Sequence, residues 1–177
     1  MLEYIASTGG AAVSTLSFTN IPNTYDSLVL RGYCTATIAY EQEAQIQFNG
    51  DTNLSNYRRT AGGKYGLLSG YGWNSASGSL FTFVPGSGIP TYGGSIVSQV
   101  DMNIFAYRKT ATVPGRPNIM SQGNYVSQNT NYNTVQFLYS TWWMGDNSVD
   151  VSSIQLQISN QNWGPQTKFH LYGRTEA

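Results

Sequence analysis

The sequence predicts an all-β protein, an antiparallel β-sandwich of the jelly-roll type. Three observations predict this fold class. Apolar and polar residues alternate with a period of two through most of the chain, clusters of Gly, Pro, Asn and Asp separate the alternating segments, and no segment has helical periodicity. The alternation also indicates antiparallel strands with one solvated face, because the strands of a buried parallel sheet are apolar throughout.

At least eight strands are expected. Alternation is clearest in residues 27–39, 44–48, 79–84, 95–107, 134–143, 152–158 and 168–173. Turn signals lie between them, in NIPNTYD, FNGDTN, VPGSGIP, TVPGRP, WMGDNS and NWGPQT. The pattern places Cys34 on the inward face of its strand. In the closing strand it directs Phe169 and Leu171 into the core, and His170 and Tyr172 outward.

Two segments lack this clear pattern. The stretch Ala61–Ser79, AGGKYGLLSGYGWNSASGS, is rich in Gly, Ser and aromatic residues and is predicted to be one long loop or two short ones. Loops of this length in a compact domain tend to make functional contacts. Met1–Ala12 is interpreted as an N-terminal arm or edge strand, and residues 13–177 as a single β-sandwich domain.

Composition excludes several function classes. The 177 residues include only 10% charged residues with a net charge of zero and no basic block, so a nucleic-acid groove built on phosphate neutralisation is disfavoured. No apolar run approaches the length that spans a membrane, and no membrane partner is expected. The single cysteine, Cys34, cannot form an internal disulfide. The N-terminus lacks the pattern of a signal peptide, which predicts synthesis in a cytoplasm.

The residues that catalysis needs are nearly absent, so no enzyme, cofactor or metal site is expected. His170 is the only histidine and is predicted to be an ordinary surface residue, too isolated for a nucleophilic site or a zinc set. Two carboxylate pairs, Glu41 with Glu43 and Asp146 with Asp150, are better explained as solvated charges than as glycosidase sites. In NGDTN, Asn49, Asp51 and Asn53 resemble part of a calcium loop, but the distal Glu is missing, and a hairpin turn is predicted instead.

Aromatic residues are the one surplus, with 13 Tyr and 4 Trp. Adjacent Trp142 and Trp143 must point to opposite faces of a strand, so one joins the core and the other is left at a surface or interface. Tyr and Trp are favoured at protein interfaces, although β-sheets also accept aromatic residues for purely structural reasons. The candidate interface or glycan contacts are Trp142, Trp143, Tyr65, Tyr71 and Trp73.

Two segments resemble a group of virion proteins of tailed bacteriophages. The group's usual form is F-x-x-I-P-x-x-Y-x-x-L-x-L followed by R-F-N-G-D-x-x-x-N-Y. The first is matched by Phe18, Ile21, Pro22, Tyr25, Leu28 and Leu30, and the second by Phe48, Asn49, Gly50, Asp51, Asn56 and Tyr57. The group's ending is matched by Ile154, Leu156, Phe169, Leu171, Tyr172 and Gly173. The resemblance extends over most of the chain, from about Phe18 to Gly173.

The resemblance implies a jelly-roll-like sandwich located in a virion, in which the matching residues are structural. It implies a capsid decoration (cement) protein that forms a homotrimer and binds the major capsid protein or another virion protein. The alternative is a tail-fibre or head-fibre module that binds a host surface glycan through the aromatic residues named above. A third possibility is a polysaccharide depolymerase using Glu41, Glu43, Asp146 and Asp150. As decoration, Met1–Ala12 would dock as an arm on an exposed strand edge.

Overall fold

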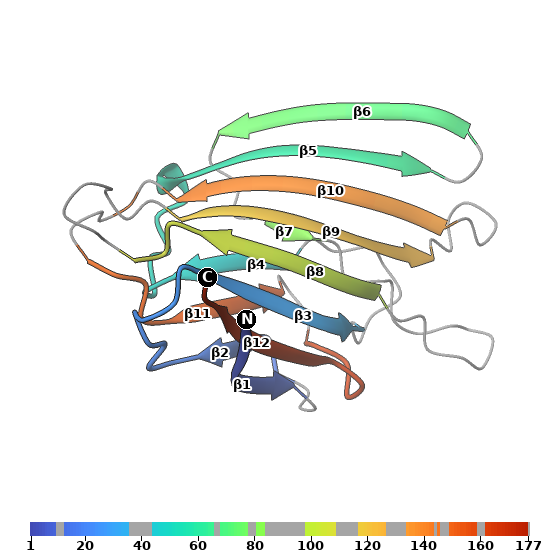
Figure 1. Ribbon diagram of the computed structural model, residues 1–177. Coiled ribbons are helices and arrows are strands. Elements are labelled where there is room, and N and C mark those ends of the chain that lie inside the picture. The colour runs from blue at the N-terminus through green and yellow to red at the C-terminus, as the bar shows by residue number, and fades with distance from the viewer. Residues whose placement is uncertain are drawn as a thin grey trace.

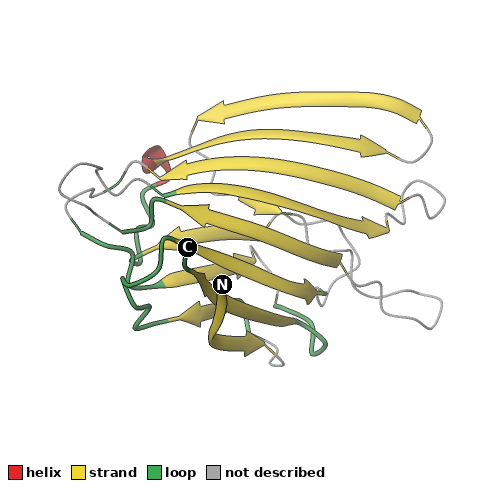
Figure 2. Cartoon of the chain, viewed as in Figure 1, coloured by secondary structure: helices red, strands yellow, loops and turns green. Residues whose placement is uncertain are grey.

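The computed structural model describes residues 1–9, 13–35, 44–65, 68–77, 81–83, 98–108, 117–126, 134–143, 145, 149–158 and 162–176. Within these residues the chain forms twelve strands and one short 3₁₀ turn, η1 (Leu54–Asn56), as Figures 1 and 2 show. All strand pairs are antiparallel, and the strands make two sheets of eight and four strands. The predicted all-β antiparallel sandwich is therefore confirmed.

The larger sheet has the strand order β1-β12-β3-β8-β9-β10-β5-β6. Its strands are β1 (Leu2–Gly9), β3 (Ser27–Cys34), β5 (Tyr57–Tyr65), β6 (Leu68–Ser77), β8 (Ser98–Phe105), β9 (Asn118–Val126), β10 (Thr134–Trp143) and β12 (Lys168–Arg174). The smaller sheet has the order β2-β11-β4-β7, and consists of β2 (Thr15–Phe18), β4 (Ala44–Phe48), β7 (Phe81–Phe83) and β11 (Ile154–Ile158).

Eight of these strands pair in a nested way. Taken in chain order without β5, β6, β9 and β10, the first strand pairs with the last, the second with the second last, and so on inward: β1 with β12, β2 with β11, β3 with β8 and β4 with β7. The pairs belong alternately to the large and the small sheet. This rolled-up pairing is the jelly-roll arrangement.

The other four strands extend only the large sheet. The β5–β6 hairpin enters the chain between β4 and β7, and the β9–β10 hairpin enters between β8 and β11. They continue the large sheet beyond β8 in the order β9-β10-β5-β6. In Figure 1, β10, β5 and β6 lie at the top of the view, and β2 and β11 lie at the opposite side of the fold. We call β9, β10, β5 and β6 the sheet extension.

The core lies between the two sheets. The largest fully buried side chains are Trp163, Tyr57, Tyr107, Phe48 and Phe169. Alternation explains the burial, because β11 and β12 each bury every second residue and leave the residues between them partly exposed. Burying each large apolar side chain contributes about 1.5–3 kcal/mol, so this core is the main source of stability. The inward position predicted for Cys34 is confirmed, since its side chain is fully buried.

Two local predictions need correction. Most of Ala61–Ser79, predicted as loop, lies in β5 and β6, which pair with each other, while β5 also pairs with β10. NGDTN is a turn but not a hairpin, because β4 before it and β5 after it belong to different sheets. For Met1–Ala12, expected to be an arm or an edge strand, the structure has an edge strand at Leu2–Gly9, paired with β12.

Candidate interaction surface and the residues that support it

The turn after β4 has the backbone that its sequence predicts. Asn49 and Gly50 both have positive φ, 51° and 71°, and the Asp51 amide donates to the Phe48 carbonyl at 2.9 Å. These are the features of a type I′ turn, for which Asn-Gly is the preferred pair. The turn changes the direction of the chain as it leaves the small sheet for the large one.

The Asn49 side chain fixes this turn to the segment 150–153, which precedes β11. Its Oδ1 accepts hydrogen bonds from the backbone amides of Ser152 and Ser153 at 2.9 and 3.1 Å. Its Nδ2 donates to the carbonyl of Asp150 at 2.9 Å. A side chain that satisfies three backbone groups of a distant loop acts as a structural clamp.

Asp51 holds a second group of contacts, the Asp51 cluster, made of Asp51, Asn56, Tyr57 and Trp143. The Asp51 Oδ2 accepts from Trp143 Nε1 at 2.6 Å and from Asn56 Nδ2 at 2.8 Å, and its Oδ1 accepts from the Asn53 amide at 2.9 Å. Burial alone would raise the pKa of this carboxyl, but the donors from Trp143, Asn56 and Asn53 outweigh it, so the pKa lies below its ordinary value.

Tyr57 completes the Asp51 cluster from inside the core. Its hydroxyl accepts from the Phe48 amide at 3.2 Å and donates to the Asp51 carbonyl at 2.9 Å. Burial raises the pKa of Tyr57 far above its ordinary value, so the hydroxyl stays protonated and able to donate. Asp51 and Tyr57 therefore close the turn, and they are committed to protein contacts rather than to a calcium ion.

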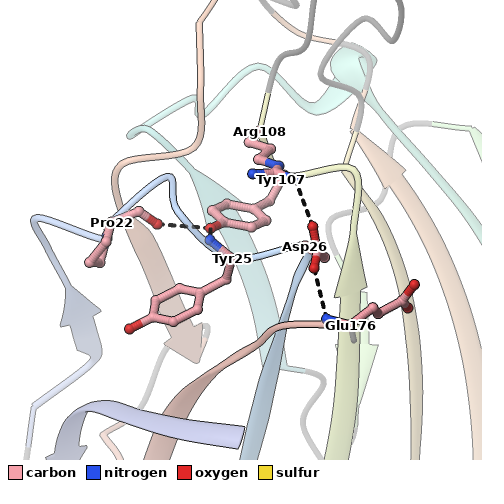
Figure 3. Close-up of polar contacts among 6 residues, drawn as sticks. All are labelled: Pro22, Tyr25, Asp26, Tyr107, Arg108 and Glu176. Atoms are coloured by element: carbon pink, nitrogen blue, oxygen red, sulfur yellow. Dashed lines mark hydrogen bonds and ion pairs between the residues drawn. The ribbon is translucent and has the colours of Figure 1, made fainter. Parts of the chain in front are cut away.

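A further group of contacts, the Tyr107 corner, lies at the same end of the sandwich (Figure 3). The Tyr107 hydroxyl donates to the Pro22 carbonyl at 2.8 Å and accepts from the Tyr25 amide at 3.1 Å. The ring of Tyr25 packs on Gly173 so closely that a Cβ at Gly173 would overlap it. The segment 150–153 joins this corner to the turn after β4, because the amide of Val151 donates to the Tyr107 carbonyl while Asn49 bonds to the same segment.

Charged groups fasten the C-terminal residues to this corner. Arg108 Nη2 and Asp26 Oδ1 form an ion pair at 2.7 Å, and Asp26 Oδ2 accepts from the Glu176 amide at 2.8 Å (Figure 3). The two chain ends lie side by side, with the Met1 ammonium donating to the Thr175 carbonyl at 2.8 Å (Figure 1). The residues of both resembling segments and of the closing strand thus build one closed end of the sandwich.

The side chains considered for catalysis do not form a site among the described residues. His170 is half-buried, and its ring neighbours are Tyr4 and Tyr172, with centroids 6.3 and 6.4 Å away. The Asp150 carboxylate accepts from Asn23 Nδ2 at 2.9 Å. Glu41, Glu43 and Asp146 lie outside the described part of the chain. Nor do the described residues contain a group of three His, Cys, Asp or Glu side chains that could hold a metal ion.

The candidate functional surface is instead the outer face of the large sheet, which points away from the small sheet. Of the eight large hydrophobic side chains that are exposed in the described part of the chain, five belong to this face, from four different strands. They are Leu2, Tyr4, Tyr33, Phe105 and Met120. Tyr4 and Met120 are 56% and 51% exposed, so half of each side chain remains available for contact.

The strand register explains why these residues share a face. Tyr4 lies opposite Tyr172, Tyr172 opposite Val29, Val29 opposite Asn103, and Asn103 opposite Met120. This row crosses five strands in succession, and residues two positions away along each strand point the same way. The register therefore places Tyr4 and Met120 on one face of the large sheet, with the fully buried Val29 between them.

Two polar pairs link different strands on the outer face. Arg31 Nε and Asp101 Oδ2 form an ion pair at 3.0 Å between β3 and β8, and Arg174 Nη2 donates to Asn103 Oδ1 at 3.2 Å. The Arg31–Asp101 pair is exposed, so it contributes little to stability. The two charges of the pair cancel each other. The face is therefore suited to contact with a partner surface that is uncharged or that carries charges of both signs.

An aromatic group lies at the β1 edge of the outer face. The rings of Tyr4 and Tyr172 meet edge to face with centroids 5.9 Å apart, and His170 lies beside both. Such tilted arrangements are favourable for aromatic pairs. The half-exposed Tyr4 ring presents an apolar surface next to the polar atoms of the Tyr172 and His170 side chains. Surfaces of this kind are common where proteins contact other proteins or sugars.

The five aromatic residues proposed from the sequence are not brought together as one described site. Trp143 is 2% exposed and bonded to Asp51, so its inclusion as a contact residue is wrong: it is the member of the Trp pair that joins the core. Trp142 occupies the register position between Asn118 and Arg58. Tyr65 lies at the end of β5, and Tyr71 and Trp73 lie in β6. The side chains of these four residues lie outside what is described.

Sequence reasoning missed the outer-face residues Leu2, Tyr4, Phe105 and Met120. Each is a single apolar residue at an outward strand position, which is common on protein surfaces. Only the register brings them together, because they come from positions 2 to 120 of the chain. A weak signal exists for Phe105 alone among these four, because it stands in an alternating segment at a position where a polar residue is expected.

No protein-family model, curated protein or solved structure matches this chain. Among the described residues there is no helix long and apolar enough to cross a membrane. A function for the chain has to come from its own residues and their arrangement.

Proposed function

We propose that this chain is a non-enzymatic structural protein of a tailed-bacteriophage virion, and that it decorates the capsid. The observation that carries the proposal is the match between the resembling residues and a closed jelly-roll end. Asn49, Asp51 and Tyr57 from one segment, Tyr25 from the other and Gly173 from the ending make the contacts that close this end. Residues with this role define a scaffold, as the resemblance implies.

The outer face supplies a way for such a scaffold to act as cement. It combines exposed apolar side chains with the Arg31–Asp101 ion pair, whose two charges neutralise each other. A decoration protein binds across neighbouring subunits of the major capsid protein, and many modest contacts of this kind stabilise the shell together. The proposed partner is therefore the major capsid protein, bound by the outer face, with three copies of this chain in one unit.

The copy number of the chain in purified particles tests this proposal. Quantitative mass spectrometry would compare its amount with that of the major capsid protein in the same sample. We expect a simple ratio set by the symmetry of the shell, such as one to one. A few copies per particle would contradict decoration, and absence of the chain from particles would contradict a virion role altogether.

The second candidate is a fibre module that binds a host surface glycan. The half-exposed Tyr4 ring beside His170 and Tyr172 favours it, because aromatic faces with neighbouring polar groups suit sugar rings. A glycan array with purified protein tests it, using Tyr4→Ala as the variant and Val13→Ala, another exposed apolar residue, as its control. We expect binding to be lost only with Tyr4→Ala, and no binding by the folded wild type would overturn the candidate.

A further inference from the structure

Charge is distributed unevenly between the large sheet and the rest of the chain. The eight strands of the large sheet contain six Lys and Arg residues but only two acidic residues, Glu3 and Asp101, which gives a net charge of +4. The whole chain has nine basic and nine acidic residues, so three basic and seven acidic residues lie outside the large sheet. A chain with zero net charge therefore has a basic sheet and acidic connecting segments.

The described basic side chains of the large sheet lie on its outer face. In β12 they alternate with buried residues, in β3 one lies opposite the outward-facing His170, and in β5 one follows the buried Tyr57. These side chains are Arg31, Arg58, Lys168 and Arg174. Of the two acidic residues in these strands only Asp101 shares the face, because Glu3 alternates with the outward-facing Tyr4 along β1.

Three of these cations, Arg58, Lys168 and Arg174, form no ion pair with a described residue. Arg174 Nη2 donates to the neutral amide of Asn103 at 3.2 Å, and Arg58 Nη1 donates to two backbone carbonyls at 2.9 and 3.0 Å. The one carboxylate of the face is already committed to its ion pair with β3. The outer face therefore keeps positive charges that nothing in the described chain neutralises.

The acidic segments of a second copy are poor partners for this face. Asp26, Asp51 and Asp150 already accept hydrogen bonds from side chains of their own chain, at 2.7, 2.6 and 2.9 Å. Docking them on the outer face of another copy would break bonds that close the end of the sandwich. A different molecule is therefore favoured as the source of negative charge.

The composition of the face favours a protein as that molecule. Arg, Tyr, Phe and Met are enriched in protein interfaces, whereas Lys is depleted there. Three of the four described cations are arginines, and the exposed Tyr4, Tyr33, Phe105 and Met120 lie among them. Nucleic acids instead select a clustered basic patch or stripe, because their phosphates follow one another closely.

We propose that the outer face binds a protein surface on which carboxylates are in excess. The identity of the partner rests on the proposed function, so this surface belongs to the major capsid protein, and the inference adds the sign of its charge. Carboxylates would face Arg58, Lys168 and Arg174, while the Arg31–Asp101 pair accommodates charges of both signs near the centre. Complementary charge of this kind speeds association and selects the correct partner.

Binding to empty shells gives the first test. Shells of the major capsid protein, assembled without DNA and without this chain, would be titrated with the purified protein at several NaCl concentrations. We expect the affinity to fall as the NaCl concentration rises, because salt screens exposed charges. An affinity independent of salt would contradict the inference and leave decoration intact. No binding at any salt concentration would overturn both.

Lys168→Gln and Ser14→Glu test where the charge acts. Each variant lowers the net charge of the chain by one, but Ser14 is an exposed residue that precedes β2 of the small sheet. We expect Lys168→Gln to weaken binding to the shells about two- to fivefold, as for an exposed ion pair, and Ser14→Glu to bind like the wild type. Equal affinities of the two variants would contradict the inference.

Asp101→Asn should act in the opposite direction. Asparagine keeps the size of the side chain and an oxygen that accepts from Arg31, but it removes the one described carboxylate of the face. We expect tighter binding to the shells by about two- to fivefold, with thermal unfolding close to that of the wild type. Weaker or unchanged binding would overturn an acidic partner surface. Binding to sonicated DNA that is tighter than binding to the shells would assign the face to nucleic acid and overturn a protein partner.

Discussion

The jelly roll and the sheet extension are built from the same kind of strand but are held in different ways. The jelly-roll strands are covered by a second sheet, and their inward residues form one core from Leu16 to Leu171. The extension strands belong to the large sheet alone, although β9 and β10 also contact β7 of the small sheet. Within the described part of the chain, the extension adds Ile119, Trp143 and Tyr57 to the core. The β5–β6 and β9–β10 hairpins thus widen the large sheet without adding a strand to the small one.

This difference predicts where the molecule is sensitive. A closed core is destabilised by small changes in volume, because its side chains are packed at nearly crystalline density. An outward position on a sheet tolerates substitution, because little packing is lost there. Four changes, taken from the jelly roll toward the extension, test this difference in order of decreasing effect on stability.

Gly173→Ala should have the largest effect. The added methyl group would overlap the Tyr25 ring, and the neighbours of that ring are fixed by the Tyr107 hydroxyl bonds. We expect a loss of about 3 kcal/mol in the free energy of unfolding, as for overpacked cores, measured by urea denaturation.

Gly50→Asn is the control for Gly173→Ala. Gly50 has open space around its Cβ position, and Asn tolerates its positive φ of 71°. We expect this variant to lose well under the amount lost by Gly173→Ala. Equal denaturation midpoints for Gly173→Ala and the wild type would show that Tyr25 can move away, and that the closed end is not tightly packed.

Tyr57→Phe should have the next largest effect. Tyr57 is the first residue of β5 and so joins the extension to the turn after β4. Removing its hydroxyl leaves the Phe48 amide and the Asp51 carbonyl without that partner, which costs about 1–3 kcal/mol when such groups are buried. Chemical denaturation of Tyr57→Phe beside Tyr33→Phe, an exposed tyrosine, would measure it, and similar losses in both would contradict the role of this hydroxyl.

The sequence could predict the jelly-roll strands better than the extension. Residues 44–48 were predicted with the bounds that β4 has, and residues 168–173 match β12 to within one residue, because their apolar and polar residues alternate regularly. In the extension only β10, residues 134–143, was predicted in the same way. β5 and β6 were missed because Gly and Ser occupy many of their positions, and such residues have low strand propensity on their own. Their pairing with β10 and with each other supplies what the local sequence does not.

The contact residues were harder to predict for a similar reason. Alternation showed that Trp142 and Trp143 point to opposite faces of their strand. Which of the two is buried depends on Asp51, which bonds to Trp143 and lies 92 residues before it in the chain. The outer face likewise depends on the order of five strands that no local pattern specifies. The turn at Asn49 was accessible from sequence because its chemistry is local, whereas its clamp on residues 150–153 was not.

The Asp51 cluster should make stability depend on acidic pH. The pKa of Asp51 is lowered in the folded protein, so the folded state favours the ionised carboxylate. This contribution is fully present above the ordinary carboxyl pKa and is lost as the pH falls through the lowered value. We expect Asp51→Asn to be less stable at neutral pH and to lose less stability on acidification than the wild type, as followed by thermal unfolding at a series of pH values. Parallel pH profiles would contradict this.

Met120→Glu should have the smallest effect on stability and the clearest effect on function. Met120 lies on β9, the first strand of the extension, with half of its side chain exposed, whereas its neighbour Ile119 is fully buried. A charge at an exposed position changes the free energy of unfolding by about 0.5 kcal/mol or less, so the fold should remain intact.

If the outer face binds capsid subunits, the same charge should lower the occupancy of the chain on particles, as measured by quantitative mass spectrometry. Val149→Glu, at a comparably exposed residue outside this face, is the matched control and should keep full occupancy. Equal occupancy of the two variants would separate the outer face from assembly and leave the aromatic group at the β1 edge as the surface to test next.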